Sequence, residues 1–211
     1  MNKLILSLLS LFIAFNSFAG KDFEGFIKYK MNFTAKVSGV NIEDLEKELG
    51  TSVYAHYKEG FYKEISNSSW MSLQLYRHDS AALFFKNHVT DTVFMKVATN
   101  DEPIEDFSYA IEENADTILG NVCNKLTVTD KHGTKSFYYS SNYPIDPKHY
   151  ETFTNANKNQ IVKLMKAIYL RLTMSYQLFT VDIEATEIKP MKLEDEMFEI
   201  PEGAKIQRIQ K

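Results

Sequence analysis

The sequence predicts a mainly β protein of the α+β class, with a curved antiparallel sheet that forms an open half-barrel and one longer helix packed over its concave side. Three observations predict it. Most runs alternate between apolar and polar residues, as half-buried strands do. Many are joined by two or three residues, which is typical of hairpins. Apolar residues at helical spacing over several turns occur in one segment, late in the chain, at residues 156–168.

Residues 1–19 have the order of a secretory signal peptide. Lys3 supplies the positive start, Leu4–Phe15 the apolar centre, and Ser17 and Ala19 the small residues of a cleavage site. The apolar run is too short to span a bilayer as a helix, and the alternative is a buried N-terminal helix. We therefore expect cleavage near Ala19 and a single domain over residues 20–211, soluble after cleavage in the periplasm or outside the cell, and not membrane-spanning.

The first strand is predicted at residues 23–33. Its alternation places Phe23, Ile27, Tyr29, Met31 and Phe33 on one face. A short helix follows at residues 42–49, because Asn41 can cap its start and Gly50 can end it.

Five strands then follow in quick succession, at residues 53–58, 61–65, 70–77, 81–85 and 89–97. Glu59-Gly60 and residues 86–88 supply short turns, so these strands should form a meander. A polar, acidic loop interrupts the sheet at residues 100–106.

The second half of the chain continues the sheet, with strands at residues 107–111, 122–128, 134–140, 169–176, 178–188 and 204–209. The helix at 156–168 is inserted among them and carries Ile161, Leu164, Met165 and Ile168 as one apolar stripe. About ten strands with so many hairpins favour a closed or half-closed barrel, and the helix stripe needs the concave face as its partner.

Composition excludes some functions and compartments. The chain has a net charge of −4 and no polybasic cluster, which argues against nucleic acid and against an anionic membrane surface. One cysteine cannot form an internal disulfide. Cys123 could be a nucleophile, a metal ligand, half of an intermolecular disulfide or a small buried residue. Its strand setting, on the face opposite Val122 and Leu126 and without an activating neighbour in sequence, favours the buried residue.

Catalytic and metal signals are weak. The histidines, His56, His78, His88, His132 and His149, show no metal-ligand spacing, and most sit near turns. Residues 101–106 lack the EF-hand pattern and are interpreted as a solvated loop. We expect no catalytic residues, no cofactor and no metal, and therefore a protein that is not an enzyme.

Apolar faces remain as the functional signal, because methionine and aromatic side chains make adaptable linings for lipid-like ligands as well as ordinary cores. Candidates for lining an apolar ligand site are Ile27, Tyr29, Met31, Val93, Met95, Leu164, Met165, Ile168, Leu172 and Met174. Two hypotheses follow. The first is a periplasmic binding or carrier-like protein for a lipid, an acyl chain or a lipoprotein lipid. The alternative is a non-catalytic structural or protein-interaction module of the cell envelope, with a filled core.

Two sequence blocks carry a resemblance. "ILGNVCNKL", with Gly120, Cys123 and Lys125, and the aromatic "SFYYSSNYPI" that follows a turn resemble exported GLPGLI-type and related domains of unknown function from Bacteroidota. The GLPGLI stretch itself is absent. The ending "DEMFEIPEGAKI" is similar to theirs and, more distantly, through Phe198, Pro201 and Gly203, to Lol-type periplasmic lipoprotein carriers. The resemblance implies an open β-barrel with helices over its concave side, and fold does not determine function.

Overall fold

The computed structural model describes residues 22–99, 107–131, 133–200 and 202–209. The predicted signal peptide and the acidic loop lie outside these residues.

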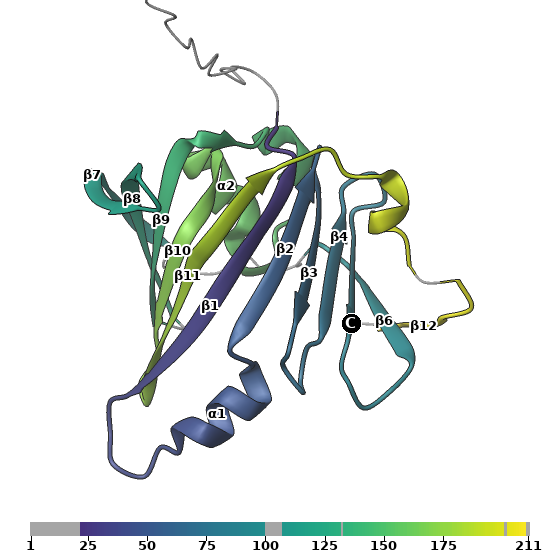
Figure 1. Cartoon of the computed structure of the whole chain (residues 1–211), viewed down its shortest axis with the longest axis horizontal. Helices are drawn as coiled ribbons and strands as arrows, with labels where there is room; N and C mark the ends of the chain where they lie inside the picture. The colour runs from purple at the N-terminus through teal and green to yellow at the C-terminus, as the bar shows by residue number, and fades with distance from the viewer. Residues whose placement is uncertain (1–21, 100–106, 132, 201, 210–211) are drawn as a thin grey trace, which may run out of the picture.

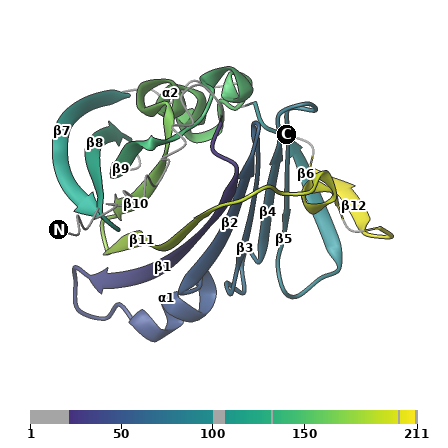
Figure 2. The same cartoon turned by 45° about the horizontal axis from the view of Figure 1, so that its top comes forward.

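The described residues form a single mostly antiparallel sheet, so the predicted fold class is confirmed. It has twelve strands in the order β12-β6-β5-β4-β3-β2-β1-β11-β10-β9-β8-β7. Only the β12–β6 pair is parallel. The sheet curves through most of a turn, and α2 lies on its concave side (Figures 1 and 2). The strands are β1 (Gly25–Ala35), β2 (Ser52–Lys58), β3 (Phe61–Ser66), β4 (Leu73–Arg77), β5 (Ala82–Lys86), β6 (Thr92–Val97), β7 (Ser108–Ile118), β8 (Asn121–Asp130), β9 (Gly133–Pro144), β10 (Ala167–Ser175), β11 (Phe179–Pro190) and β12 (Lys205–Arg208).

The predicted meander is present from β2 to β6, and the β2–β3 hairpin shows why its turn needs glycine. Glu59 and Gly60 both have positive φ, 41° and 83°. This geometry matches the right-handed twist of the flanking strands. A Cβ on Gly60 would lie 2.5 Å from Cβ of His149, so the turn packs directly against the segment before α2.

The short helix α1 (Ile42–Leu49) forms as predicted. The side chain of Asn41 accepts a hydrogen bond from the Glu43 amide at 3.0 Å, and Gly50, at φ 86°, ends the helix. These contacts satisfy backbone groups that a short helix leaves without partners.

The late helix α2 (Lys158–Met165) is shorter than the sequence predicts. Lys166 adopts the left-handed conformation and ends it, so Ile168 belongs to β10 rather than to the helix. Helical spacing continued past the true end because the first residues of β10 are also apolar. The helix buries Ile161, Val162 and Met165, whereas Leu164 is only half-buried.

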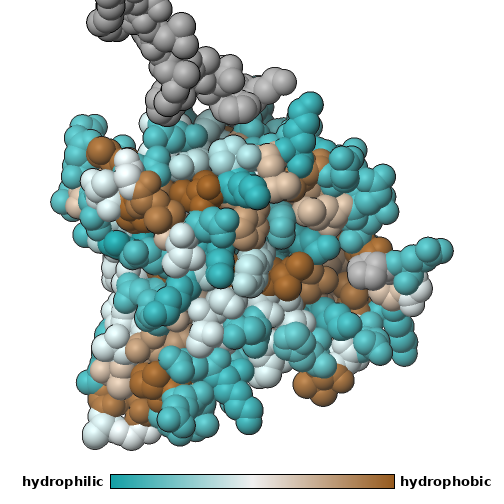
Figure 3. All heavy atoms as spheres, in the orientation of Figure 1, coloured by the Kyte–Doolittle hydropathy of each residue, from teal (hydrophilic) through white to brown (hydrophobic). Residues whose placement is uncertain are grey.

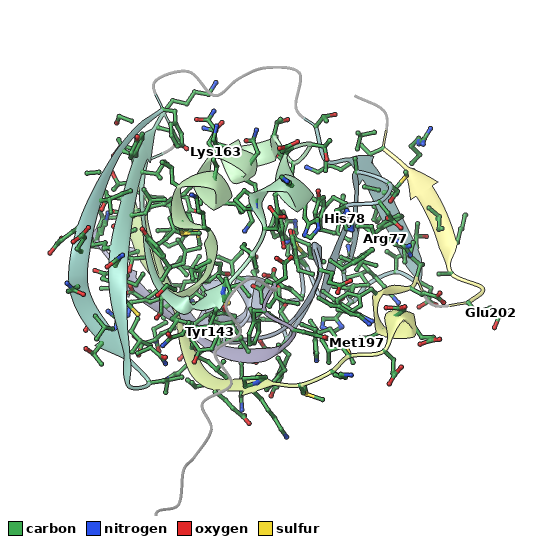
Figure 4. The ribbon with its side chains drawn as sticks, turned by 90° about the horizontal axis from the view of Figure 1, so that it is seen from above. Arg77, His78, Tyr143, Lys163, Met197 and Glu202 are labelled. Carbon is green, nitrogen blue, oxygen red and sulfur yellow. The ribbon has the colours of Figure 1, made fainter. Side chains whose placement is uncertain are left out.

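The sheet has an apolar core on each face. The larger one lies between the concave face and α2, together with Tyr150 and Phe153 of the segment before that helix. The smaller one lies on the outer face, where Leu75, Phe84 and Val93 are covered by Leu193 and Phe198 of the C-terminal segment. That segment includes the 3-10 helix η3 (Asp195–Phe198), which carries Met197 and lies outside the sheet in Figure 4. Elsewhere on the side seen in Figure 3, the surface is mostly hydrophilic with separate hydrophobic patches.

Cys123 is fully buried in the larger core, and its thiol donates to the Asn121 carbonyl at 3.3 Å. Alternation predicted that Cys123 and Leu126 face opposite sides, but both side chains are buried in that core. The regular pairing of β7 with β8 shifts between Glu112 and Asp116, where Asn114 has a φ of 52°. Cys123 and Leu126 are three residues apart and both buried, so the period of two is interrupted in β8 itself, beside this irregular pairing, and the predicted face was wrong.

Candidate functional site

The concave face carries a groove with a volume of about 400 Å³, here called the inner groove. This volume lies within the range of about 300–1,000 Å³ that is typical of small-molecule sites. Strands β1, β2, β3, β4, β10 and β11 build its walls, together with the loop 67–72 and the end of α1. It is lined by Met31, Leu49, Val53, Glu64, Ser66, Ser68, Trp70, Met71, Gln74, Tyr169, Met174, Tyr176, Phe179, Val181 and Ile183.

The walls of the inner groove are mainly apolar because of strand register. Met31 of β1 pairs with Ile183 of β11, and Val181 of β11 pairs with Met174 of β10, so their side chains share the concave face. At the mouth, Trp70 is 67% exposed, and Tyr176 packs its ring 5.2 Å from that of Phe179. The mouth therefore has apolar and aromatic edges.

The opposite end of the inner groove, where Glu64 and Tyr169 border the small space under α2, is polar and is here called the closed end. Glu64 lies on β3 between Tyr62 and Ser66, whose side chains share the concave face, and is paired in register with Gln74 of β4. Nε2 of Gln74 donates to the Tyr62 hydroxyl at 2.8 Å and to Oε2 of Glu64 at 3.3 Å. Tyr169 of β10 completes this polar end.

Beyond the polar end, under α2, lies a second cavity of only about 10 Å³, enough for about one water molecule. Glu64 and Tyr169 line both cavities, so the two cavities adjoin at these side chains. Lys158, the first residue of α2, lines the small cavity, and its ammonium lies 5.8 Å and 5.9 Å from the ring centroids of Tyr62 and Tyr169. Val162, Met165 and Ile168 also line this cavity.

Burial perturbs both charged groups at this end. Desolvation raises the pKa of Glu64, and the charge of Lys158 partly opposes that shift. Desolvation likewise lowers the pKa of Lys158, with Glu64 opposing it. Both residues keep some solvent contact, yet protein surrounds them closely enough to disfavour their charged forms. Perturbed carboxyl and amine groups within a concavity are typical of functional sites.

Tyrosines fix the shape of the polar end. Tyr29 donates its hydroxyl to the Tyr169 carbonyl at 2.9 Å, and burial raises the pKa of Tyr29 far above its usual value. The Tyr62 ring stacks on that of Phe153, which stacks in turn on Tyr76 at 4.6 Å. This packed aromatic layer holds the hydroxyl of Tyr62 in place above the inner groove.

The predicted lining residues fall in four places. Met31 and Met174 line the inner groove, and Met165 and Ile168 line the small cavity under α2. Ile27, Tyr29 and Leu172 are buried in the larger core, with Leu164 packed against it. Val93 and Met95 belong instead to the smaller core, because Met95 is in register with Phe84 and Leu75 on the outer face.

Glu64, Gln74, Trp70 and Lys158 were not among the candidates from sequence. Glu64 carried little signal, since only Tyr62 and Ser66 share its phase in the strand, whereas the apolar Phe61 and Ile65 lie in the opposite phase. The other residues reach the site through the curvature of the sheet and the position of α2, which periodicity does not encode.

A second polar cluster lies near the β2–β3 and β4–β5 turns. Nδ1 of His149 contacts Oδ2 of Asp22 at 2.8 Å, and its ring lies 4.8 Å from that of His78 (labelled in Figure 4). Desolvation and the neighbouring His149 lower the pKa of His78. In the described part of the chain, no group of three or more His, Cys, Asp or Glu side chains is arranged to hold a metal ion.

Comparisons with known proteins identify no family. Neither a protein-family model nor a curated protein matches the sequence, so the resemblance to GLPGLI-type domains stays a prediction. Among solved structures, the chain is similar to PNGF-II, with a TM-score of 0.46 and 10% identity over 88% of this chain and 32% of that one. It is also similar to the lipoprotein LppX of Mycobacterium tuberculosis, with a TM-score of 0.35 and 8% identity over 81% and 90%. The chain thus spans about a third of PNGF-II, and both TM-scores lie below 0.5.

Proposed function

We propose that this protein is a non-catalytic binding or carrier protein, exported to the periplasm or beyond, that holds an elongated apolar or amphiphilic ligand in the inner groove. The single observation that supports it best is the groove itself, a space of about 400 Å³ walled mainly by methionine, aliphatic and aromatic side chains. No helix within the described ranges is long and apolar enough to cross a membrane.

The energetics are adequate for useful affinity. Burying apolar ligand surface contributes roughly 25 cal/mol per Å², so a few hundred Å² offset several kcal/mol of association cost. The methionines Met31, Met71 and Met174 are flexible and suit a chain of variable shape. Micromolar binding corresponds to about −8 kcal/mol and is within reach of such a groove.

The test is direct binding to delipidated protein. Trp70 is the only tryptophan of the chain and sits at the mouth, so its fluorescence reports occupancy without assignment. A fatty acid, a lysophospholipid and an environment-sensitive apolar dye are titrated, with calorimetry in parallel. We expect saturable binding of at least one of them in the micromolar range.

A groove-filling variant provides the control. Val53 lines the inner groove, so Val53→Phe should weaken binding at least tenfold. Val97 is exposed and lies outside the groove, so the same change there, Val97→Phe, should leave affinity unchanged. If no probe binds saturably below about 100 μM, or if Val53→Phe in a folded variant has no effect, the groove is not a ligand site.

One observation favours the alternative, an envelope interaction module. Strand β7 is an edge of the sheet, and its residues from Ser108 to Asn114 are exposed. An exposed edge strand can accept a strand from another protein. Absence of ligand binding together with a partner whose binding is lost on Ile111→Pro, which breaks the edge strand, would favour this function.

A further inference from the structure

We infer that the inner groove selects a single-chain amphiphile that enters head group first, and that this head group is uncharged and carries a hydroxyl or amide able both to donate and to accept a hydrogen bond. This inference rests on the proposed function and specifies its ligand class.

The orientation follows from where polar atoms lie in the groove. Glu64, Gln74 and Tyr169 are at the closed end, whereas Trp70 and Phe179 are at the mouth. An apolar chain entering tail first would place its end against desolvated polar groups, which would then lose hydrogen-bonding partners. Head-first entry instead puts polar groups together and leaves the chain between apolar walls.

Serine hydroxyls near the mouth do not compete for the head group. Ser66 donates its hydroxyl to the Met71 carbonyl, and Ser68 donates to the Glu48 carbonyl, each at 2.5 Å. Both hydroxyl hydrogens are thus used in shaping the loop 67–72. The hydroxyl of Tyr176, also near the mouth, donates to Sδ of Met174 at 3.5 Å. The closed end therefore holds the charged and amide side chains of the groove, Glu64 and Gln74.

The closed end has both a hydrogen-bond acceptor and a hydrogen-bond donor without partners among the described residues. Glu64 accepts from Gln74 through Oε2, and within the described residues its Oε1 has no hydrogen-bond partner. Lys158 contacts the rings of Tyr62 and Tyr169, and its ammonium forms no hydrogen bond or ion pair with any described residue. Glu64 and Lys158 thus offer an acceptor and a donor that line the same space, which is the size of a water molecule.

Charge then selects the head group. Glu64 and Lys158 carry opposite charges that balance each other, so an anionic or a cationic head would leave this poorly solvated site with a net charge, whereas an uncharged head would not. A hydroxyl or amide can donate to the Glu64 carboxylate and accept from the Lys158 ammonium without bringing a charge of its own. The cavity of about 10 Å³ between these residues accommodates a single such group, in place of one water molecule.

The test compares single-chain probes that share one alkyl chain and differ in the head: a monoacylglycerol, the fatty acid, the alkylamine, the fatty acid methyl ester and a lysophosphatidylcholine. Affinities are measured below the micelle concentration by displacement of the apolar dye. We expect the monoacylglycerol to bind at least tenfold tighter than each of the other probes. The methyl ester separates the role of the hydrogen-bond donor from that of the chain.

Charge-removing variants identify the residues responsible. Glu64→Gln should raise affinity for the fatty acid at least fivefold, and Lys158→Gln should do the same for the alkylamine. Matched controls are Glu187→Gln and Lys163→Gln, because both of these residues are exposed and lie outside the cavities (Lys163 is labelled in Figure 4). The controls should leave the order of the probes unchanged.

Orientation is measured through Trp70. A bromine at the terminal carbon of the chain should quench its fluorescence more strongly than a bromine beside the head group. Stronger quenching by the head-proximal bromine would overturn head-first entry. Equal binding of all heads, unchanged by Glu64→Gln and Lys158→Gln, would overturn head-group selection yet leave apolar binding intact, whereas failure of every probe to bind would remove the proposed function itself.

Discussion

Gln74 of β4 lies directly opposite Glu64 of β3 in the sheet, and its side-chain amide donates to the Glu64 carboxylate at 3.3 Å. This pair places a carboxyl group in a largely apolar concavity, where desolvation raises its pKa. Charged residues in such a setting reduce stability unless they are fully paired. The position of Glu64 therefore suggests a binding role rather than a contribution to folding.

The first prediction concerns the pH dependence of stability. Since the folded-state pKa of Glu64 lies above its ordinary value of 4.5, the folded protein holds the proton more tightly than the unfolded chain. The Glu64 contribution to stability should fall as the pH rises from about 4.5 through the folded pKa, and then level off. Glu64→Gln should consequently have the wild-type melting temperature near pH 4 and a higher one at pH 8.

Thermal unfolding of both proteins from pH 4 to pH 8 measures this difference, with Glu187→Gln as the control at an exposed carboxylate. A Glu64→Gln variant that is less stable than wild type at pH 8 would contradict the prediction. So would a difference in melting temperature between the two proteins that is the same at every pH.

The second prediction concerns the β2–β3 turn. Gly60→Ala should destabilise the protein strongly for two reasons. The new Cβ would lie 2.5 Å from Cβ and 2.7 Å from Cγ of His149, and the alanine would have to adopt a positive φ. Strain of the backbone costs about 1–2 kcal/mol, and overpacking against the histidine adds about 1–3 kcal/mol. Urea unfolding provides the measurement.

Gly120→Ala separates the cost of backbone strain from the cost of overpacking against His149. Gly120 has a similar φ of 76°, but a Cβ there would have no atom within 4 Å. It should therefore show the backbone cost alone. Equal losses at Gly60 and Gly120 would mean that contact with His149 contributes nothing.

The third prediction concerns Cys123. The thiol is fully buried and its pKa is raised mainly by desolvation, so it should be a poor nucleophile near neutral pH. Cys123→Ala should leave ligand binding unchanged and lower the free energy of unfolding by about 1–2 kcal/mol. Native protein should react with a thiol reagent far more slowly than unfolded protein, and rapid native labelling coupled to loss of binding would refute this.

The fourth prediction concerns export. The order of charged, apolar and small residues before Ala19 predicts cleavage at or near Ala19-Gly20 in the producing cell. N-terminal sequencing of the protein from that cell decides the matter. An intact Met1 or a membrane-integrated chain would disprove it.

The local sequence pattern was sufficient to predict which side chains are buried where one face of a strand or helix is buried throughout its length. On β1 the alternation predicted that Ile27, Tyr29, Met31 and Phe33 are buried, and they are. Asn41 and Gly50 marked the ends of α1 because capping is a local interaction between a side chain or a φ angle and the adjacent backbone. Two-residue turns likewise predicted the hairpins of the meander.

Tertiary structure decided everything that depends on which surfaces meet. The C-terminal segment covers the outer face, so Met95 packs there rather than facing the concavity. Cys123 and Leu126 of β8 are buried in the same core, beside the irregular pairing of β8 with β7. A period of two or 3.6 residues predicts which face of a strand or helix is apolar, but not what packs against that face. It could therefore not distinguish a filled core from an open groove. The volume beside Met31 and Met174, and the approach of Lys158 to Glu64, arise only when the curved sheet closes around α2.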